Sequence, residues 1–217
     1  AVAVASRSGR VAIVGGGPAG LAAAYRLTQL GFRPTLFDAE AALGGVLRTG
    51  IPTYRLPRDV LDREVLAIVA RGVDLRLGQR LDREVMSRLP RDFDAVILAT
   101  GLQSLRDVDG PRTELAGVEQ GIHFLRRVNV EGDVRLSGRV VVLGGGNTAM
   151  DCARSALRVG AERVTVAYRR TRDEMPAIRE EVDEAMAEGV AFEFLRAPIG
   201  YEGEGRVRAV ALAEVDL

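Results

Sequence analysis

The chain contains the same order of hydrophobic and glycine-rich segments twice. Each copy begins with a short apolar run and a glycine-rich turn, continues with a helical pattern of apolar positions, and ends with a second apolar run. The segments are residues 11–14, 15–20, 21–30 and 35–37 in the first copy and residues 140–143, 144–149, 150–159 and 164–168 in the second. A short, continuously apolar run is typical of a strand buried in a parallel sheet, so each copy predicts a βαβ unit. We therefore expect an α/β fold with two Rossmann-like dinucleotide-binding units.

Three glycines of the first turn have a mechanical reason for their positions. Gly15 permits the tight turn after the strand, Gly17 lets the backbone approach a pyrophosphate, and Gly20 lets the helix pack closely on the strand. The free N–H groups and the positive dipole end of that helix then face the phosphates. Asp38 ends the second apolar run, 18 positions after Gly20, where a carboxylate can accept hydrogen bonds from a ribose. The alternative, a glycine-rich turn in an ordinary α/β protein, leaves the ordered series of strand, turn, helix, strand and acid unexplained.

The second copy ends in different chemistry. Tyr168 is followed by Arg169 and Arg170, and Arg172 lies close behind. Guanidinium groups bind a ribose 2′-phosphate, whereas the carboxylate of Asp38 would repel it. The first unit therefore suits a dinucleotide with free ribose hydroxyls, such as FAD or NAD, and the second suits NADP. The alternative for the arginines is a solvated loop, which is plausible in a chain so rich in arginine.

Further elements are expected between and after the two copies. The pattern predicts helices at residues 58–71, 82–89 (capped by Asp82) and 178–188, and strands at residues 73–77 and 93–98. Residues 103–119 look irregular, as domain crossovers often do. Residues 190–195 and 207–212 look like the two strands of a hairpin, whose loop would contain Gly200, Gly203 and Gly205.

Composition and charge exclude several classes of function. The 217 residues carry 30 basic and 30 acidic side chains, so nothing indicates binding to nucleic acid or to a membrane surface. The single cysteine, Cys152, excludes an internal disulfide and a self-supplied iron–sulfur cluster, and it fits a reducing, cytoplasmic compartment. We interpret Cys152 as a small buried residue. With His123 as the only histidine, a metal site is not expected.

Beyond these patterns, longer segments closely resemble one family, the small (β) subunit of NADPH-dependent glutamate synthase and its relatives. These relatives include the flavin/NADPH half of dihydropyrimidine dehydrogenase and the large subunit of electron-bifurcating transhydrogenase. The segments that carry the resemblance are GGGPAGLAAAYRL, GGVLRTGIPTYRLP, VILATG, VVVLGGGNTAMDCARSALRVGAERVTVAYRR and EMPA. The resemblance runs from about Arg10 to Leu212. It implies a two-dinucleotide flavoprotein in which NADPH reduces FAD and the electrons then leave through iron–sulfur clusters.

The resemblance also implies roles for particular residues. In the first unit, FAD would be bound by the glycine turn, by Asp38 in place of the more usual Glu, by the loop that follows it and by the Ala-Thr-Gly strand end. These residues are Gly15, Gly17, Pro18, Ala19, Gly20, Asp38, Gly45, Val46, Arg55, Thr100 and Gly101. In the second unit, NADPH would be bound by the second turn and by the arginines. Asp151 is the candidate for a polar role near the nicotinamide, and a helix-capping or structural role is the alternative for it. The residues assigned in the second unit are Gly144, Gly145, Gly146, Asn147, Thr148, Asp151, Arg169 and Arg170.

No catalytic side chain is expected, because in hydride transfer between nicotinamide and flavin the cofactors carry the chemistry. Under this resemblance, residues 1–9 form a linker, residues 10–117 the N-terminal part of an FAD-binding domain, and residues 118–217 an NADPH-binding domain. The family usually adds a cysteine-rich iron–sulfur domain before this region and a Gly-Asp segment after it that closes the FAD site. We therefore expect a truncated version, with an iron–sulfur protein or large catalytic subunit as partner and a missing segment or chain that closes the FAD site.

Two other functions stay open. One is an NADPH-dependent reductase that acts directly on a small molecule. The other is a non-catalytic or incomplete nucleotide-binding scaffold in a larger redox complex.

Overall fold

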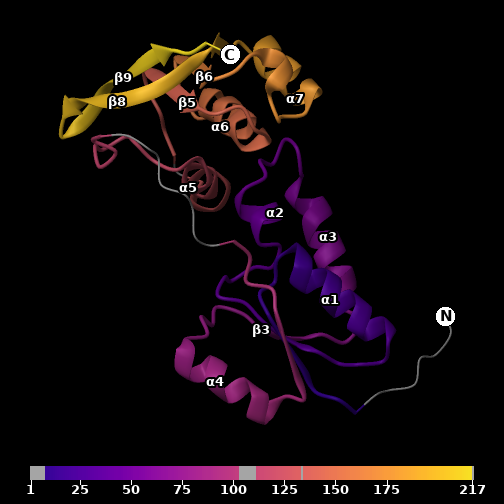
Figure 1. Cartoon of the computed structure of the whole chain (residues 1–217). Coiled ribbons are helices and arrows are strands. Elements are labelled where there is room, and N and C mark those ends of the chain that lie inside the picture. Colours follow the sequence, from indigo (N-terminus) through magenta and orange to yellow (C-terminus); the bar gives the residue numbers. More distant parts are fainter. Residues whose placement is uncertain (1–7, 103–110, 133, 217) are drawn as a thin grey trace. The chain divides into compact units, whose positions relative to one another are not determined.

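A computed structural model of the chain describes residues 8–102, 111–132 and 134–216 (Figure 1). The chain divides into two compact units, Ala1–Leu105 and Arg106–Leu217, which we call unit 1 and unit 2. Within the described residues, no helix is both long enough and apolar enough to cross a lipid bilayer.

Unit 1 is built on a parallel sheet of four strands in the order β3-β2-β1-β4. Its elements are β1 (Val11–Val14), α1 (Pro18–Gln29), β2 (Thr35–Phe37), α2 (Val46–Thr49), α3 (Arg58–Val69), β3 (Asp74–Arg76), α4 (Arg83–Asp92) and β4 (Ala95–Leu98). The apolar run of β1 is buried at all four positions, as expected for a central strand. Helices α1 and α3 pack together, with α4 apart from them (Figure 1). The α/β class of the fold is therefore confirmed.

Local sequence explains where the helices of unit 1 begin and end. Helix α1 has Pro18 at its first position, where a missing N–H costs no hydrogen bond, and buries Leu21 and Ala24 in the core. Gly31 follows its end with φ +91°. The prediction that Asp82 caps α4 is confirmed, since its side chain accepts a hydrogen bond from the backbone N–H of Val85 at 2.9 Å.

Unit 2 contains a parallel sheet of three strands, in the order β5-β6-β7, and a separate two-stranded hairpin. Its elements are α5 (Gly121–Arg126), a π-helical turn (Arg127–Glu131), β5 (Arg139–Leu143), α6 (Asn147–Arg158), β6 (Arg163–Tyr168), a 3-10 turn (Arg172–Glu174), α7 (Arg179–Ala187), β7 (Ala191–Phe194), β8 (Arg196–Glu204) and β9 (Arg206–Glu214). Helix α6 packs on the sheet, and its fully buried Met150 and Ala153 share one hydrophobic cluster with Val164 and Val166 of β6. The second βαβ prediction is thus confirmed as well.

The predicted hairpin is wrong in its first strand. Residues 190–195 do not pair with residues 207–212; they contain β7, which extends the parallel sheet beside β6. Leu195, with φ +56°, lies directly after β7, and the hairpin is formed by β8 and β9. Gly200 and Gly203 lie inside β8, at or next to irregularities in its pairing, and of the three glycines only Gly205 lies in the turn. Glycines inside a strand mark such bulges, so their presence did not require a loop.

A buried arginine joins α6 to α7. The guanidinium of Arg154 contacts Glu181 at 2.8 Å, Glu184 at 2.7 Å and Glu188 at 2.8 Å, and its side chain is only 6% exposed. Arg158 binds Glu188 as well, at 2.6 Å. The hydrogen bond from Arg158 is the main cause that lowers the pKa of Glu188 to about 2; partial burial opposes this effect, and Arg154 adds to it.

This network predicts a specific loss of stability in acid. Because the pKa of Glu188 is lower in the folded chain than its ordinary value of 4.5, its stabilisation is present above about pH 4.5 and is lost as the pH falls toward 2. We expect the free energy of unfolding, measured by urea titration, to fall less steeply over this range in a Glu188→Gln variant than in the wild type. Equal slopes for the two proteins would contradict this assignment.

Candidate dinucleotide-binding sites

The first glycine turn is fixed by close backbone contacts. Gly15 has φ +107°, and a Cβ atom added there would lie 2.2 Å from the carbonyl oxygen of Ala99. A Cβ atom on Gly20 would lie 1.8 Å from the carbonyl oxygen of Gly15. Side chains at these two positions are therefore excluded by the protein's own packing, as the sequence pattern predicts.

Gly17 is different, because packing does not require a glycine there. It precedes α1 with an ordinary φ of −77°, and an added Cβ atom would approach no closer than 3.8 Å to the Cα atom of Gly45. The next residues, Pro18 and Ala19, are exposed at the start of the helix. The turn thus leaves open backbone at a helix N-terminus, the geometry that suits a phosphate group.

Asp38 lies against this turn. Its carboxylate accepts hydrogen bonds from the backbone N–H groups of Gly16 at 2.5 Å and of Glu40 at 2.7 Å. An added Cβ atom on Gly16 would come within 2.9 Å of the same carboxylate and 2.2 Å of Leu43. Gly16 therefore has a packing role that the fingerprint, which specifies only the flanking glycines, does not predict.

The loop after β2 also reaches the turn. The N–H of Gly44 donates to the carbonyl oxygen of Gly16 at 2.9 Å, and a Cβ atom on Gly45 would lie 2.7 Å from the Cα atom of Gly17. Val46, at the start of α2, is half exposed. At the end of β4, Thr100 and Gly101 are exposed. The loop after β2 therefore contacts the first turn. The chain directly after β4 contacts it as well, through Ala99, which lies against Gly15.

Arg58 was not singled out from the sequence, yet it holds this loop together. Its guanidinium donates to four backbone carbonyl oxygens at distances of 2.8 to 3.2 Å: those of Leu47 and Arg48 in α2, and those of Ile51 and Leu56 after it. Burial lowers the pKa of Arg58, and the nearby cationic Arg48 lowers it further. Arg55, which the resemblance assigns to the flavin side, is half-buried in the segment that Arg58 fixes. Backbone carbonyls leave no signal in a sequence, so this role could not be predicted.

The second glycine turn has a geometry similar to that of the first, except that an alanine replaces its third glycine. Gly144 has φ +126°, and its N–H donates to the carbonyl oxygen of Ala167 at 3.0 Å. Ala149 replaces the third glycine, and a Cβ atom on Gly144 would lie 4.0 Å from that of Ala149, an ordinary contact. A Cβ atom on Gly146, just before α6, would meet no described atom within 4 Å. Gly146 therefore offers open backbone at a helix N-terminus, as Gly17 does.

The remaining residues predicted on α6 differ in exposure. Thr148 is exposed, whereas Asp151 is only 4% exposed. Asn147 accepts a hydrogen bond from the N–H of Ile178 at 2.9 Å, which ties the Met-Pro-Ala loop to the turn. Cys152 is 5% exposed, and burial, reinforced by Asp151, raises the pKa of its thiol to about 12. The interpretation of Cys152 as a small buried residue is confirmed.

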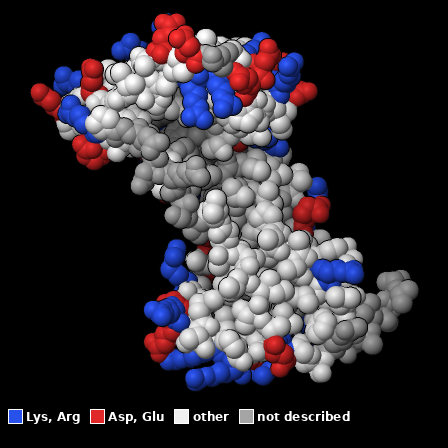
Figure 2. All heavy atoms as spheres, in the orientation of Figure 1, with Lys and Arg blue, Asp and Glu red and all other residues white. Residues whose placement is uncertain are grey.

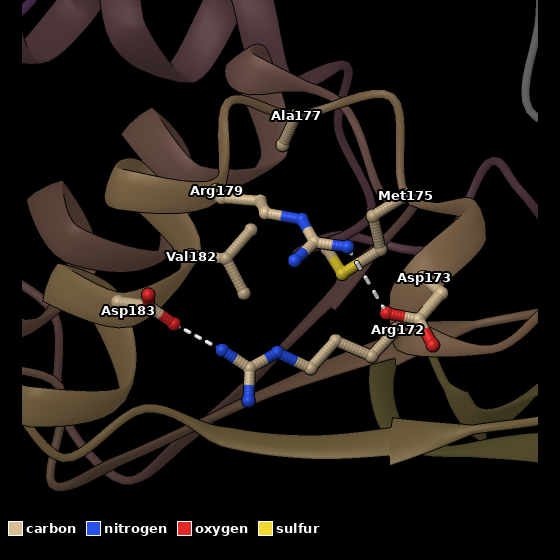
Figure 3. A pocket seen from close by; sticks show the side chains of 7 residues that line it. All are labelled: Arg172, Asp173, Met175, Ala177, Arg179, Val182 and Asp183. Atoms are coloured by element: carbon tan, nitrogen blue, oxygen red, sulfur yellow. Dashed lines mark hydrogen bonds and ion pairs between the residues drawn. The ribbon is translucent and has the colours of Figure 1, made fainter.

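Two pockets lie beside the loop that follows β6 and begins at Arg169. Arg169 and Arg170 are exposed and line a pocket of about 450 Å³. The other residues around it are Glu174, Val215 and Asp216. In the second pocket, of about 280 Å³, Arg172 points toward Asp183 and Arg179 toward Asp173 (Figure 3). Met175, Ala177 and Val182 complete that lining. Elsewhere on the visible face, basic and acidic side chains lie close together in both units (Figure 2).

The geometry defines a protein with two glycine turns of the dinucleotide-binding type, one in each unit. A family model for the pyridine nucleotide-disulphide oxidoreductases matches residues 9–216, and the chain belongs to this family. The chain is also similar in fold to FprA of Mycobacterium tuberculosis, solved in complex with NADPH, with a TM-score of 0.82 at 20% identity over 96% of this chain and 64% of that one. Both findings confirm the predicted two-dinucleotide fold.

Curated relatives confirm the narrower resemblance. The chain is 40% identical to the glutamate synthase (NADPH) small chain of Escherichia coli K12, over 96% of this chain and 47% of the relative. It is 48% identical to the β subunit of NADP(+)-dependent formate dehydrogenase of Moorella thermoacetica, over 96% of this chain and 30% of the relative. The chain therefore spans less than half the length of these two relatives.

Proposed function

We propose that the chain is the NADPH-to-FAD reductase module of a protein like the glutamate synthase small subunit. FAD would bind to unit 1 and NADPH to unit 2. The observation that carries this proposal is the contrast between the two units: Asp38 lies against the first glycine turn, whereas Arg169 and Arg170 follow the strand beside the second. A carboxylate suits free ribose hydroxyls and guanidinium groups suit a 2′-phosphate.

The residues present fit both cofactors. Packing does not require a glycine at either Gly17 or Gly146: an added Cβ atom would make only an ordinary 3.8 Å contact with Gly45 at the first position and would meet no described atom within 4 Å at the second. Both positions therefore leave room for a pyrophosphate to approach the backbone. The N–H groups that begin α1 and α6 would donate to those phosphates. When bound, FAD supplies the chemistry, since it accepts a hydride and releases electrons one at a time. The chain would bind the two nucleotides and orient them.

We further propose an iron–sulfur protein or a large catalytic subunit as the electron acceptor, together with a further segment or chain that closes the FAD site. The names of the relatives support the existence of a partner, since they describe β subunits and small chains of larger enzymes.

The exposed edges of the two sheets support the presence of a further segment or chain. Among the described residues β4 and β5 each pair with a strand on one side only, and they leave Leu98 65% and Val141 41% exposed. Apolar edge strands of this kind are normally covered. A chain with one cysteine cannot form an internal disulfide, which agrees with the reducing environment of the cytoplasm.

The arginines provide a direct test of the nucleotide assignment. We expect the double variant Arg169→Ala/Arg170→Ala to bind NADPH at least about a hundredfold more weakly, because each charge-assisted hydrogen bond contributes about 1.5–3 kcal/mol. NADH has no 2′-phosphate, so its affinity should change little. Isothermal titration calorimetry with both nucleotides measures the two values.

The matched control is Arg163→Ala, since Arg163 is an exposed arginine at the opposite end of the same strand. It should bind both nucleotides as the wild type does. Equal losses for NADPH and NADH in the double variant would contradict a 2′-phosphate site at these residues. A chain that binds NADPH but never transfers its electrons to FAD would instead favour the scaffold alternative.

A further inference from the structure

Tyr168 lies where the second glycine turn meets the arginine-bearing loop. It is the last residue of β6, directly before Arg169. Its ring fills the space above Gly145, because a Cβ atom added to that glycine would lie 2.7 Å from the Cδ2 and Cε2 atoms of the ring. The ring therefore packs on the backbone of the turn that the NADPH pyrophosphate is proposed to contact.

The hydroxyl of Tyr168 reaches the far end of the same loop. It donates a hydrogen bond to the backbone carbonyl oxygen of Glu174 at 2.9 Å. Glu174 ends the 3-10 turn, and its carboxylate accepts from the N–H and the hydroxyl of Thr171 at 3.3 and 3.1 Å. This reciprocal cap makes residues 171–174 a folded turn. Tyr168 attaches that turn to the strand.

After Glu174 the chain returns to the glycine turn. The N–H of Ala177 donates to the carbonyl oxygen of Gly145 at 3.1 Å, and the N–H of Ile178 donates to the side chain of Asn147 at 2.9 Å. The glycine turn and the loop after β6 are therefore joined to each other by hydrogen bonds. Tyr168 contacts both segments: its ring packs on Gly145 of the turn, and its hydroxyl is bonded to Glu174 of the loop.

We propose that Tyr168 is a positioning residue for nucleotide selectivity, an inference that rests on the proposed NADPH site. By fixing the loop against the glycine turn, it sets where the backbone of Arg169 and Arg170 lies relative to the pyrophosphate. Both arginine side chains are long and exposed, so a backbone held in place lowers the entropy lost when they bind a 2′-phosphate. Tyr168 itself would discriminate NADPH from NADH without contacting the phosphate.

The test is Tyr168→Phe, which keeps the ring over Gly145 and removes only the hydroxyl. We expect the affinity for NADPH to fall about three- to tenfold, the effect of one ordinary hydrogen bond, with little change for NADH. Hydrogen–deuterium exchange without nucleotide should become faster at the backbone amides of Glu174, Met175, Ala177 and Ile178, while the melting temperature stays close to that of the wild type. Tyr201→Phe is the matched control, since the buried hydroxyl of Tyr201 has no hydrogen-bond partner among the described residues.

The outcomes separate this inference from the proposed function. A wild type that binds NADPH, with a Tyr168→Phe variant that shows the same ratio of NADPH to NADH affinity, overturns the role of Tyr168 alone. Unchanged exchange at the backbone amides of Glu174, Met175, Ala177 and Ile178 overturns it as well, and that measurement requires no nucleotide. A wild type that binds neither nucleotide contradicts the proposed function and removes the selectivity role with it.

Discussion

Replacing Gly20 with alanine is expected to unfold unit 1 or to destabilise it by about 3 kcal/mol or more, and to abolish FAD binding. The added Cβ atom would lie 1.8 Å from the carbonyl oxygen of Gly15. That oxygen belongs to the backbone and cannot rotate away, so α1 would have to move off β1. Urea unfolding gives the stability, and visible absorbance after incubation with FAD gives the flavin content.

Gly17→Ala is the matched control for this prediction. It adds the same methyl group three residues away, at a position where φ is −77° and the nearest contact would be 3.8 Å. We expect the stability to change by about 1 kcal/mol or less, the effect of alanine at a helix N-cap. FAD affinity should nevertheless fall by at least about tenfold, because the methyl group occupies the approach of the pyrophosphate. Normal stability of Gly20→Ala, or normal FAD affinity of Gly17→Ala, would contradict the assigned roles.

Replacing Arg154 with methionine is expected to destabilise unit 2 by about 3–5 kcal/mol. Arg154 is 6% exposed and is the common partner of Glu181, Glu184 and Glu188, which all lie on or directly after α7. Methionine keeps the apolar stem but leaves three carboxylates without their shared cation. Because α7 follows the Met-Pro-Ala loop, NADPH affinity should fall in the same variant. Urea unfolding and calorimetric titration measure the two effects.

Arg158→Met serves as the control for Arg154→Met. The side chain of Arg158 is 41% exposed, and its ion pair with Glu188 lies nearer the solvent than the pairs of Arg154, so the loss should be about 1 kcal/mol or less. If Arg154→Met were as stable as Arg158→Met, the buried network would not be what holds α7 on α6.

The glycine turns were predictable because their chemistry is local. A positive φ at Gly15 and Gly144 and the close contact at Gly20 follow from the order of strand, turn and helix. For the same reason the capping role of Asp82 could be predicted from sequence. The family resemblance added the assignments that spacing alone does not provide.

Other features depend on contacts between distant residues and could not be predicted. The pattern of residues 190–195 is compatible with a hairpin strand or a parallel strand, and only packing beside β6 decides between them. Arg58 stabilises its loop by donating to backbone carbonyl oxygens, and the partners of Arg154 lie on or directly after a helix that begins 25 residues later. The hydrogen bond from Tyr168 to Glu174 likewise exists only because the loop folds back.

The most direct test of the proposed function is the visible absorption spectrum of the chain incubated with FAD, before and after anaerobic addition of NADPH. We expect a bound-flavin spectrum that is bleached by NADPH, and by NADH only at higher concentration. A protein that retains FAD whose spectrum stays unchanged with NADPH, or a protein that retains neither nucleotide, would contradict the account.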